Sequence, residues 1–242
     1  MEKETGNIAQ MFDSIADRYD FLNHFFTLHI DKLWRRKAAN ELRGLPLDNV
    51  LDVATGTADF AIKLHSRLKP KHITGVDISE GMLAIGRKKI EKKGLCRQIS
   101  LKYGDSTALP FDDQSFDAVT VAFGVRNFED LEKGLCEMYR VLKIGGKLII
   151  LELATPENRV VRVIHNYYTS CILPFFGRFL SSNAKAYKYL PNSVKSFPHW
   201  VELKKIMEKC SFDEVKIKSL SFGVAGIYTG TKKLRENEKS EI

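Results

Sequence analysis

The stretch "NVLDVATGTADF" (49–60) decides the fold. Its first five residues form the apolar run of a buried strand, and a helical segment begins at Asp59 after a short turn. The dinucleotide-binding fingerprint G-x-G-x-x-G would place glycine where this turn has Ala54, Gly56 and Asp59. The pattern therefore indicates a strand–turn–helix unit of an α/β sheet, with a turn that is poor in glycine.

Strands and helices continue to alternate on the C-terminal side of this unit. Such alternation predicts a parallel sheet with right-handed crossovers. The last two strands are joined only by a short turn, so they must run antiparallel. We therefore predict an α/β fold around a doubly wound, mostly parallel seven-stranded sheet with an antiparallel C-terminal hairpin. The predicted strands are 49–53, 72–77, 99–103, 116–123, 147–153, 212–220 and 222–232, and the predicted helices are 59–68, 80–93, 129–142 and 199–209.

The chain is predicted to form one domain over residues 1–233. Two helices precede the first strand; the second covers 31–42, and together they make an N-terminal helical lid (1–45). Residues 154–198 break the alternation with aromatic and proline-containing sequence, which indicates an insertion on the substrate side. The charged segment 234–242 is typical of a disordered tail.

Charge and hydropathy limit the partners of the chain. Thirty-eight Lys and Arg against thirty Asp and Glu give its 242 residues a formal net charge of +8. This permits nucleic acid or an anionic membrane as partner, but apart from "GRKKIEKKG" (86–94) the basic residues are scattered, which favours a solvated surface. The N-terminus is unlike a signal peptide, and the longest uncharged stretch (163–177) is too short to span a bilayer. We expect a cytoplasmic protein that can touch the inner face of the membrane.

The four cysteines are widely spaced. They lie 35 to 40 residues apart and form no C-x-x-C motif, so neither a zinc knuckle nor a redox dithiol is indicated. Reduced thiols are therefore expected. The four are Cys96, Cys136, Cys171 and Cys210.

Polar residues follow the first three strands, at the edge where doubly wound sheets bind ligands. Gly56 allows close backbone approach, and Asp77 ends the second strand 21 residues later, where a carboxylate receives both ribose hydroxyls. Asp105 and Ser106 follow the third strand, where an adenine amino group could be recognised. A pyrophosphate needs more glycine than this turn has. The arrangement fits S-adenosylmethionine better than NAD, the alternatives being a plain packing turn and a capping role for Asp77.

Several longer motifs make a resemblance specific. They stand in the order "MFDSIADRYDFLN" (11–23), "DVATGTADF" (52–60), "GVDISEGML" (75–83), "GDSTALPFDDQSFD" (104–117), "FGVRN" (123–127), "YRVLKIGGKLIILEL" (139–153), "AYKYLPNSVKSFP" (186–198) and "GIYTGTKK" (226–233). Together they resemble the ubiquinone/menaquinone biosynthesis C-methyltransferase family, a group of class I methyltransferases, over residues 8–233.

The resemblance implies a donor, an acceptor and cofactor-binding positions. S-adenosylmethionine would methylate a ring carbon of a polyprenylated benzoquinol or naphthoquinol, and demethylmenaquinol is preferred to a ubiquinone precursor. The family's cofactor positions fall on Thr57, Asp77, Asp105 and Ser106. In two places the sequence departs from the family: Ala58 stands for a glycine, and Ile144 for the proline of "KPGG".

The catalytic candidates are Arg126 and Asn127, directly after the fourth strand. A quinol resembles tyrosine in acidity, with a pKa of about 10, so a base or a positive field is needed near neutral pH. Arg126 would stabilise the quinolate, directly or through a water, and Asn127 would hold that water or a quinol oxygen. The alternatives are a structural salt bridge for Arg126 and a cap of the 129–142 helix for Asn127.

Other candidate residues have simpler interpretations. His24 and His29 are interpreted as packed or surface histidines rather than bases. Tyr187 and Tyr189 either line the ring pocket or pack as aromatics. No metal is expected, because the sulfonium leaving group is already activated.

Three functions remain open at this point. Besides the quinone C-methyltransferase, they are a methyltransferase of the same fold acting on tRNA or a small molecule, and a non-catalytic cofactor-binding subunit. The stretch 163–180 is apolar and aromatic, unlike a surface that follows phosphates, so no nucleic acid partner is expected. This stretch either meets the membrane reversibly or forms a buried lid.

Overall fold

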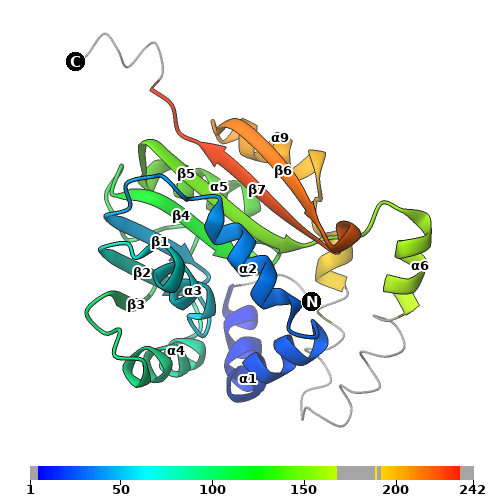
Figure 1. Cartoon of the computed structure of the whole chain (residues 1–242), viewed down its shortest axis with the longest axis horizontal. Helices are drawn as coiled ribbons and strands as arrows, with labels where there is room; N and C mark the ends of the chain where they lie inside the picture. Colours follow the sequence, from blue (N-terminus) through cyan, green and yellow to red (C-terminus); the bar gives the residue numbers. More distant parts are fainter. Residues whose placement is uncertain (1–4, 168–188, 190–191, 235–242) are drawn as a thin grey trace.

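The computed structural model describes residues 5–167, 189 and 192–234. Its centre is a seven-stranded sheet in the order β3-β2-β1-β4-β5-β7-β6 (Figure 1). Strands β1 to β5 run parallel, whereas β7 is antiparallel to both β5 and β6. The predicted sheet and its C-terminal hairpin are confirmed. The strands are β1 (Asn49–Val53), β2 (His72–Asp77), β3 (Ile99–Tyr103), β4 (Phe116–Ala122), β5 (Leu142–Leu153), β6 (Asp213–Leu220) and β7 (Ala225–Thr231).

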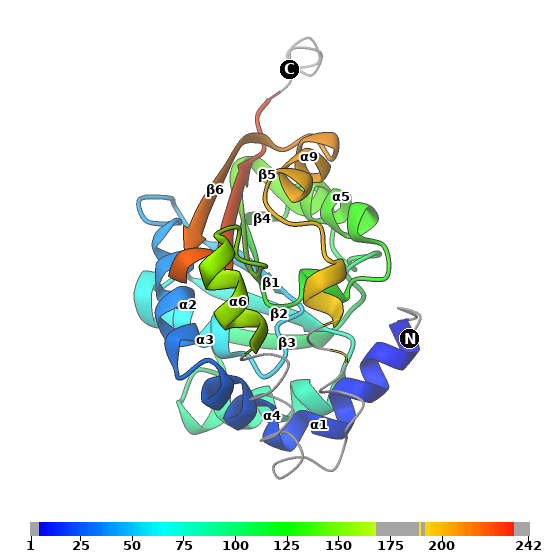
Figure 2. The same ribbon diagram turned by 90° about the vertical axis from the view of Figure 1, so that its right-hand side faces the viewer.

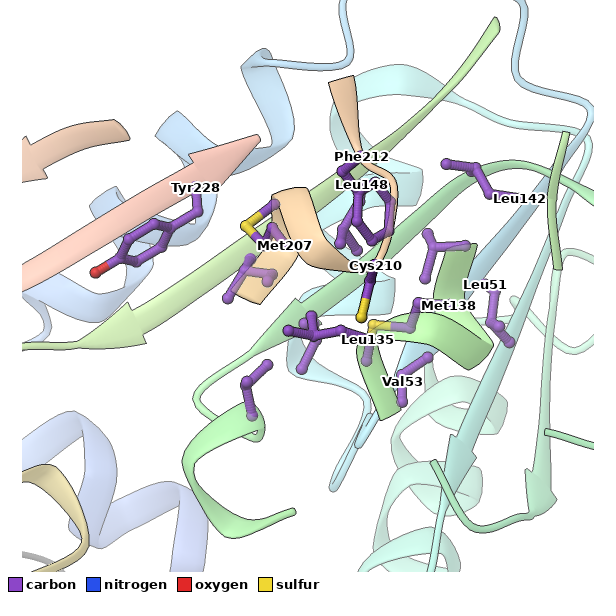
Figure 3. Close-up of a cluster of buried hydrophobic side chains, with 14 of the residues drawn as sticks. Leu51, Val53, Leu135, Met138, Leu142, Leu148, Met207, Cys210, Phe212 and Tyr228 are labelled. Atoms are coloured by element: carbon purple, nitrogen blue, oxygen red, sulfur yellow. The ribbon is translucent and has the colours of Figure 1, made fainter. Parts of the chain in front are cut away.

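Helices cover both faces of the sheet (Figure 2). Apolar residues of α2, α3 and α4 pack on one face and those of α5 and α9 on the other, so the central strands are buried on both sides. Figure 3 shows part of the apolar core on the face that α5 and α9 cover, with Leu135 and Met138 of α5 and Met207 of α9. The helices are α1 (Thr5–Phe26), α2 (Ile30–Asn40), α3 (Asp59–Leu68), α4 (Glu80–Lys92), α5 (Leu131–Val141), α6 (Arg159–Tyr167) and α9 (Val201–Lys209), with short 3₁₀ turns η1 (Val125–Asn127) and η3 (Ser221–Gly223).

Two boundaries differ from prediction for local reasons. Strand β5 already begins at Leu142, because the "IGG" segment stays in the sheet, with Gly145 at φ +80°. Helix α5 begins at Leu131, and the carboxylate of Asp130 caps it by accepting from the Lys133 amide at 2.9 Å. The alternative that Asn127 caps this helix is therefore wrong.

The expectation that all cysteines are reduced is also wrong. Cys136 on α5 and Cys210 after α9 form a disulfide with their Cα atoms 4.9 Å apart, while Cys96 is free and exposed. The paired residues are 74 positions apart and become neighbours only because α5 packs against α9. Spacing along the sequence therefore carried no signal for this pair. Cys171 lies outside the described residues.

Within the described residues, no helix is long and apolar enough to cross a membrane. Most of the stretch 163–180 and all of 235–242 lie outside the described residues, so the predictions made for them stay predictions. The N-terminal part is described almost entirely, and α1 carries apolar residues at i, i+3, i+4 and i+7, which form a stripe along one face. Of that stripe, Ile8 and Met11 are buried, and Phe12 and Ile15 are half-buried.

Candidate active site

A pocket opens at the carboxyl ends of β1, β2 and β4, where the doubly wound topology predicts it. The space between its walls is about 670 Å³, a volume that includes open solvent at its mouth. Helix α1 covers it with Ile8, Phe12 and Tyr19. The turn after β1 contributes Ala54 and Gly56, the ends of β2 and β3 contribute Asp77, Ile78, Gly104, Asp105 and Ser106, and the segment after β4 contributes Phe123, Gly124, Asn127, Phe128 and Glu129.

The turn after β1 is tightly wound. Ala54, Gly56 and Ala58 all have left-handed backbones, with φ of +50°, +54° and +64°. Alanine pays about 1–2 kcal/mol for such a conformation, whereas glycine does not. The family's glycine at position 58 is thus replaced by a strained alanine, which is fully buried at the start of α3.

The loop after β4 lies directly against this turn. A Cβ atom at Gly124 would lie 2.5 Å from the Cβ of Ala54, so only glycine permits this approach. The glycine of "FGVRN" therefore brings the segment that carries Asn127 up to the turn that carries Gly56. The two halves of the predicted site share one pocket for this reason.

Asp77 joins the turn to the start of α4. Its Oδ2 accepts from the Gly56 amide at 2.8 Å, and its Oδ1 accepts from the Ser79 amide at 2.9 Å. Burial raises the pKa of Asp77, although these amide hydrogen bonds oppose the shift. A carboxylate has about four acceptor positions, so the two amides leave capacity for ribose hydroxyls. Ser79 caps α4, accepting from the Met82 amide at 3.1 Å.

Asp105 and Ser106 line the pocket past the end of β3. The Oδ1 of Asp105 accepts from the amide of Thr107 at 2.8 Å and from its hydroxyl at 3.0 Å, which fixes the carboxylate in a local turn. Gly104, just before it, donates its amide to the Asp77 carbonyl at 3.1 Å. The structure thus brings four of the five predicted cofactor residues together around one pocket.

Thr57, the fifth, is not among the residues that line this pocket. It is buried, and its hydroxyl donates to Oδ1 of Asp20 on α1 at 2.5 Å. Lys89 on α4 contacts the same hydroxyl at 3.2 Å and forms ion pairs with Asp20, at 2.7 Å, and with Asp59. Burial opposes ionisation of Asp59, but the charges of Lys89 and Arg35 outweigh it and lower its pKa. Thr57 therefore fastens α1 to the cofactor turn.

A second contact fastens the lid about two helical turns away along α1. Asp13 on α1 accepts at Oδ1 from the Ser79 hydroxyl at 2.5 Å and from the Gly81 amide at 2.9 Å, at the positive end of the α4 dipole. Asp13, Tyr19 and Asp20 were missed by reasoning from the sequence. All three lie in the motif "MFDSIADRYDFLN" (11–23), which supported the family resemblance but indicated no role for a single residue.

Arg126 is buried behind the pocket rather than in its wall. Its Nη1 forms an ion pair with Oε1 of Glu152 on β5 at 2.7 Å and also donates to the Phe123 carbonyl. Burial disfavours the charge, yet the pKa of Arg126 is raised because Glu152 lies beside it. Its Nε is buried and has no hydrogen-bond partner among the described residues. The salt bridge proposed as an alternative for Arg126 is present.

Asn127 does face the pocket. Its Oδ1 accepts from the hydroxyl of Tyr189 at 3.1 Å, which brings the described part of the insertion to the end of β4. Burial raises the pKa of Tyr189 and of Tyr19, so both phenols are neutral donors near neutral pH. Tyr187 lies outside the described residues.

The lid histidines occupy the structural positions that were expected of them. His24 pairs its Nδ1 with Asp31 at 2.9 Å, and its Nε2 lies 3.4 Å from Asp59. His29 is exposed in the turn before α2. Neither is among the residues that line the pocket.

Comparisons with known proteins agree with this geometry. A SAM-dependent methyltransferase of Thermotoga maritima, described as a possible histamine N-methyltransferase, has the same fold, with a TM-score of 0.64, 22% identity, and coverage of 93% of this chain and 100% of that one. Fold and site together define a class I methyltransferase whose cofactor is S-adenosylmethionine.

The sequence comparisons identify the family within this class. The profile of the ubiE/COQ5 methyltransferase family matches residues 1–232. A demethylmenaquinone methyltransferase of Bacteroides fragilis is 48% identical over 95% of this chain and 94% of its own. A ubiquinone/menaquinone biosynthesis C-methyltransferase of Geobacter sulfurreducens is 44% identical over 94% and 89%. The chain belongs to the ubiE/COQ5 methyltransferase family, so the predicted resemblance is confirmed.

Proposed function

We propose that the protein methylates a ring carbon of demethylmenaquinol to give menaquinol. The observation that carries this proposal is the shared pocket, in which Asp77 and Asp105 stand at one end and Asn127 at the other. A donor nucleoside and a flat acceptor ring can thus meet at the carboxyl edge of the sheet. The 48% identity to a demethylmenaquinone methyltransferase favours this acceptor over a ubiquinone precursor.

The residues at the donor end fit S-adenosylmethionine. The half-buried carboxylate of Asp77 keeps acceptor capacity toward the pocket, and Gly56 leaves open space where a side chain would stand. Asp77 would hold the ribose hydroxyls, and Asp105 and Ser106 the adenine edge, with Gly56 admitting the ligand to the backbone. When bound, S-adenosylmethionine supplies an electrophilic methyl group on sulfur, so the chain has only to orient and activate the acceptor.

At the acceptor end, Asn127 and Tyr189 are the groups suited to contact a quinol oxygen. Both are polar and uncharged, and they already share a hydrogen bond. They would orient the ring and stabilise the oxygen as its proton leaves. Glu152 neutralises much of the Arg126 charge, so Arg126 contributes chiefly by fixing η1 through Glu152 and Phe123. A direct electrostatic role of Arg126 stays a prediction.

Methyl transfer from labelled donor tests the proposal. The purified protein should label a short-chain demethylmenaquinol faster than a ubiquinone precursor and should leave tRNA unlabelled. Asn127→Ala should lower turnover by about tenfold or more, the loss expected for a hydrogen bond to a developing charge, with little change in donor affinity. Equal labelling of both quinols, or labelling of tRNA alone, would contradict the assignment.

We also propose that the enzyme works as a peripheral protein at the cytoplasmic face of the membrane. The polyprenyl tail of the proposed acceptor is insoluble in water, so the ring has to be reached at a bilayer surface. The predicted contact, 163–180, lies mostly outside the described residues. Within it, Val163 and Tyr167 are exposed, as a membrane contact requires.

A further inference from the structure

The exposed apolar side chains gather on one side of the molecule. Twelve large apolar side chains among the described residues are exposed, and nine of them lie on four neighbouring segments. A concentration of exposed apolar side chains on neighbouring segments is typical of an interaction site. The nine, here called the apolar face, are Phe21, Phe25 and Leu28 on α1 and the turn after it, Ile30 and Leu33 on α2, Val160, Val163 and Tyr167 on α6, and Phe222 in η3.

Specific contacts hold these segments side by side. The indole nitrogen of Trp34 on α2 donates to the hydroxyl of Ser221 in η3 at 2.9 Å. A Cβ atom at Gly223 would lie 3.2 Å from the Cα of Pro156, so η3 also packs against the chain that enters α6. Both overall views place α6 beside the η3 turn and on the same side as the α1–α2 turn (Figures 1 and 2). The apolar face is therefore a built feature of the fold.

Its two most exposed members are held in an unfavourable backbone conformation. Phe222 is 84% exposed with φ +58°, and Leu28 is 71% exposed with φ +50°. A bulky side chain at positive φ is rare and costly, and such strain is concentrated at functional sites. Here the strained residues present large apolar side chains to solvent. This combination of strain and exposure favours insertion into an apolar phase.

Basic residues surround the apolar face. Lys32 and Arg36 on α2 and Arg159 and Arg162 on α6 are exposed on the same segments. The exposed acids on these segments are fewer, namely Asp13 and Asp17 on α1 and Glu157 before α6. A second copy of this chain would bring the same basic rim toward itself. An anionic lipid surface instead complements both the charge and the apolar side chains.

We propose that the apolar face docks the enzyme on an anionic bilayer, with Phe222 and Leu28 inserted among the lipids. The inference rests on the proposed function in one respect, because only a membrane-bound acceptor gives the docking a purpose. Helix α1 links the two sites: its N-terminal part lines the pocket through Ile8 and Phe12, and its C-terminal end belongs to the apolar face. Docking thus places the lid of the pocket next to the bilayer.

Vesicle flotation tests the docking without using the reaction. The wild-type protein should float with phosphatidylcholine vesicles that contain phosphatidylglycerol, and much less with phosphatidylcholine alone. Phe222→Asn with Leu28→Asn should lower the partition coefficient by about tenfold or more, because two inserted apolar groups are lost. Asparagine suits positive φ, so the variant keeps its fold. Lys32→Glu with Arg36→Glu should reduce binding and its salt dependence.

A matched control is available elsewhere on the surface. Tyr103 and Val201 are each 58% exposed and lie outside the apolar face, so Tyr103→Ser with Val201→Ser should float like the wild type. Wild-type protein that never floats, or equal loss in this control, would overturn the proposal. Dissociation of a dimer by Phe222→Asn, without loss of flotation, would assign the surface to a second copy instead.

Activity on two acceptors separates this inference from the proposed function. The Phe222→Asn, Leu28→Asn variant should turn over a water-soluble short-chain quinol at the wild-type rate and a vesicle-embedded long-chain quinol more slowly. If no quinol is methylated while flotation behaves as expected, the proposed function fails and the docking surface stands. Equal rates on both acceptors, with flotation lost, would show that docking does not serve the reaction.

Discussion

The two ends of the pocket are built in different ways. At the donor end, Asp77 is held by backbone amides of Gly56 and Ser79, both close to strand ends that the sequence marks clearly. At the acceptor end, η1 is held by a buried ion pair whose partner, Glu152, lies 26 residues further along the chain. These backbone amides fix the position of the carboxylate, and its remaining acceptor positions can meet a ligand. A buried ion pair fixes one geometry, and its loss is costly.

The largest expected effect is on the acceptor end. Removing one partner of the Arg126–Glu152 pair leaves an uncompensated buried charge, which typically destabilises a protein by ~3–5 kcal/mol. Glu152→Met and Arg126→Met should each lower stability by about this amount in urea unfolding, and the double substitution should recover most of it. Single variants as stable as the wild type would show that the pair does not hold η1.

The stable double variant also tests the electrostatic role of Arg126. If the guanidinium stabilises the quinolate, turnover falls by ~10²–10³ while donor affinity stays nearly constant. Part of that loss should be recovered at higher pH, because the quinol then ionises unaided. If Arg126 only positions η1, any loss of turnover in the double variant is the same at every pH, because ionisation of the quinol does not restore the position of η1.

The next largest effect is expected at the donor end. Asp77→Ala should raise the dissociation constant of S-adenosylmethionine by an order of magnitude or more, since a hydrogen bond to a charged group contributes ~1.5–3 kcal/mol. Calorimetry on the folded variant measures this. Ser79 and Gly56 lose an acceptor as well, so unfolding should be followed in parallel, with Asp105→Ala as a second donor-end variant. Unchanged affinity in a folded Asp77→Ala protein would remove the ribose assignment.

The same contrast explains what the sequence could predict. Asp77, Asp105 and Ser106 were identifiable because strand ends and turn chemistry are local signals, and the doubly wound, mostly parallel sheet follows from the alternation of strands and helices and the handedness of their crossovers. The Thr57–Asp20 hydrogen bond, the Arg126–Glu152 pair and the Cys136–Cys210 disulfide join residues 37, 26 and 74 positions apart. Each depends on how helices and strands pack, which leaves no periodic pattern in the chain. The acceptor end was therefore only partly predictable.

A smaller effect, on the pH dependence of stability, is expected at Asp52, which lies on β1 just before the turn that carries Gly56. Asp52 is buried and accepts from the hydroxyls of Thr55 and Thr120, each at 2.7 Å, yet burial raises its pKa from 3.8 to about 6. The folded state thus binds this proton more tightly than the unfolded state, and the stability contributed by the protonated form is lost as pH rises from about 4 through about 6.

Asp52→Asn should remove this pH dependence. Thr120 can turn its hydroxyl to the Leu51 carbonyl, 3.3 Å away, and accept from the new amide. At pH 7 we expect a gain of about 1 kcal/mol, less than the full shift would give because the amide fits this site less well. The free energy of unfolding should therefore differ less between pH 4 and pH 7 in the variant than in the wild type. An unaltered difference would place the pH dependence elsewhere.

The smallest effect, on the rate of donor release, is expected where α1 is held to the turn after β1 through Asp20 and Thr57. The carboxylate of Asp20 accepts a hydrogen bond from the Thr57 hydroxyl at 2.5 Å and forms an ion pair with Lys89 at 2.7 Å. The side chains of Asp20 and Lys89 are 30% and 24% exposed, so water weakens their ion pair. Such partly exposed pairs contribute ~0.2–1 kcal/mol, which corresponds to a few-fold change in rate. Asp20→Asn should therefore speed release of S-adenosylmethionine by about two- to fivefold in stopped-flow measurements, because α1 opens more readily. Asp17→Asn, an exposed change one turn earlier on the same helix, is the matched control and should leave the rate unchanged. If both variants release the donor at the wild-type rate, α1 does not limit exchange, and Thr57 serves only to anchor the helix.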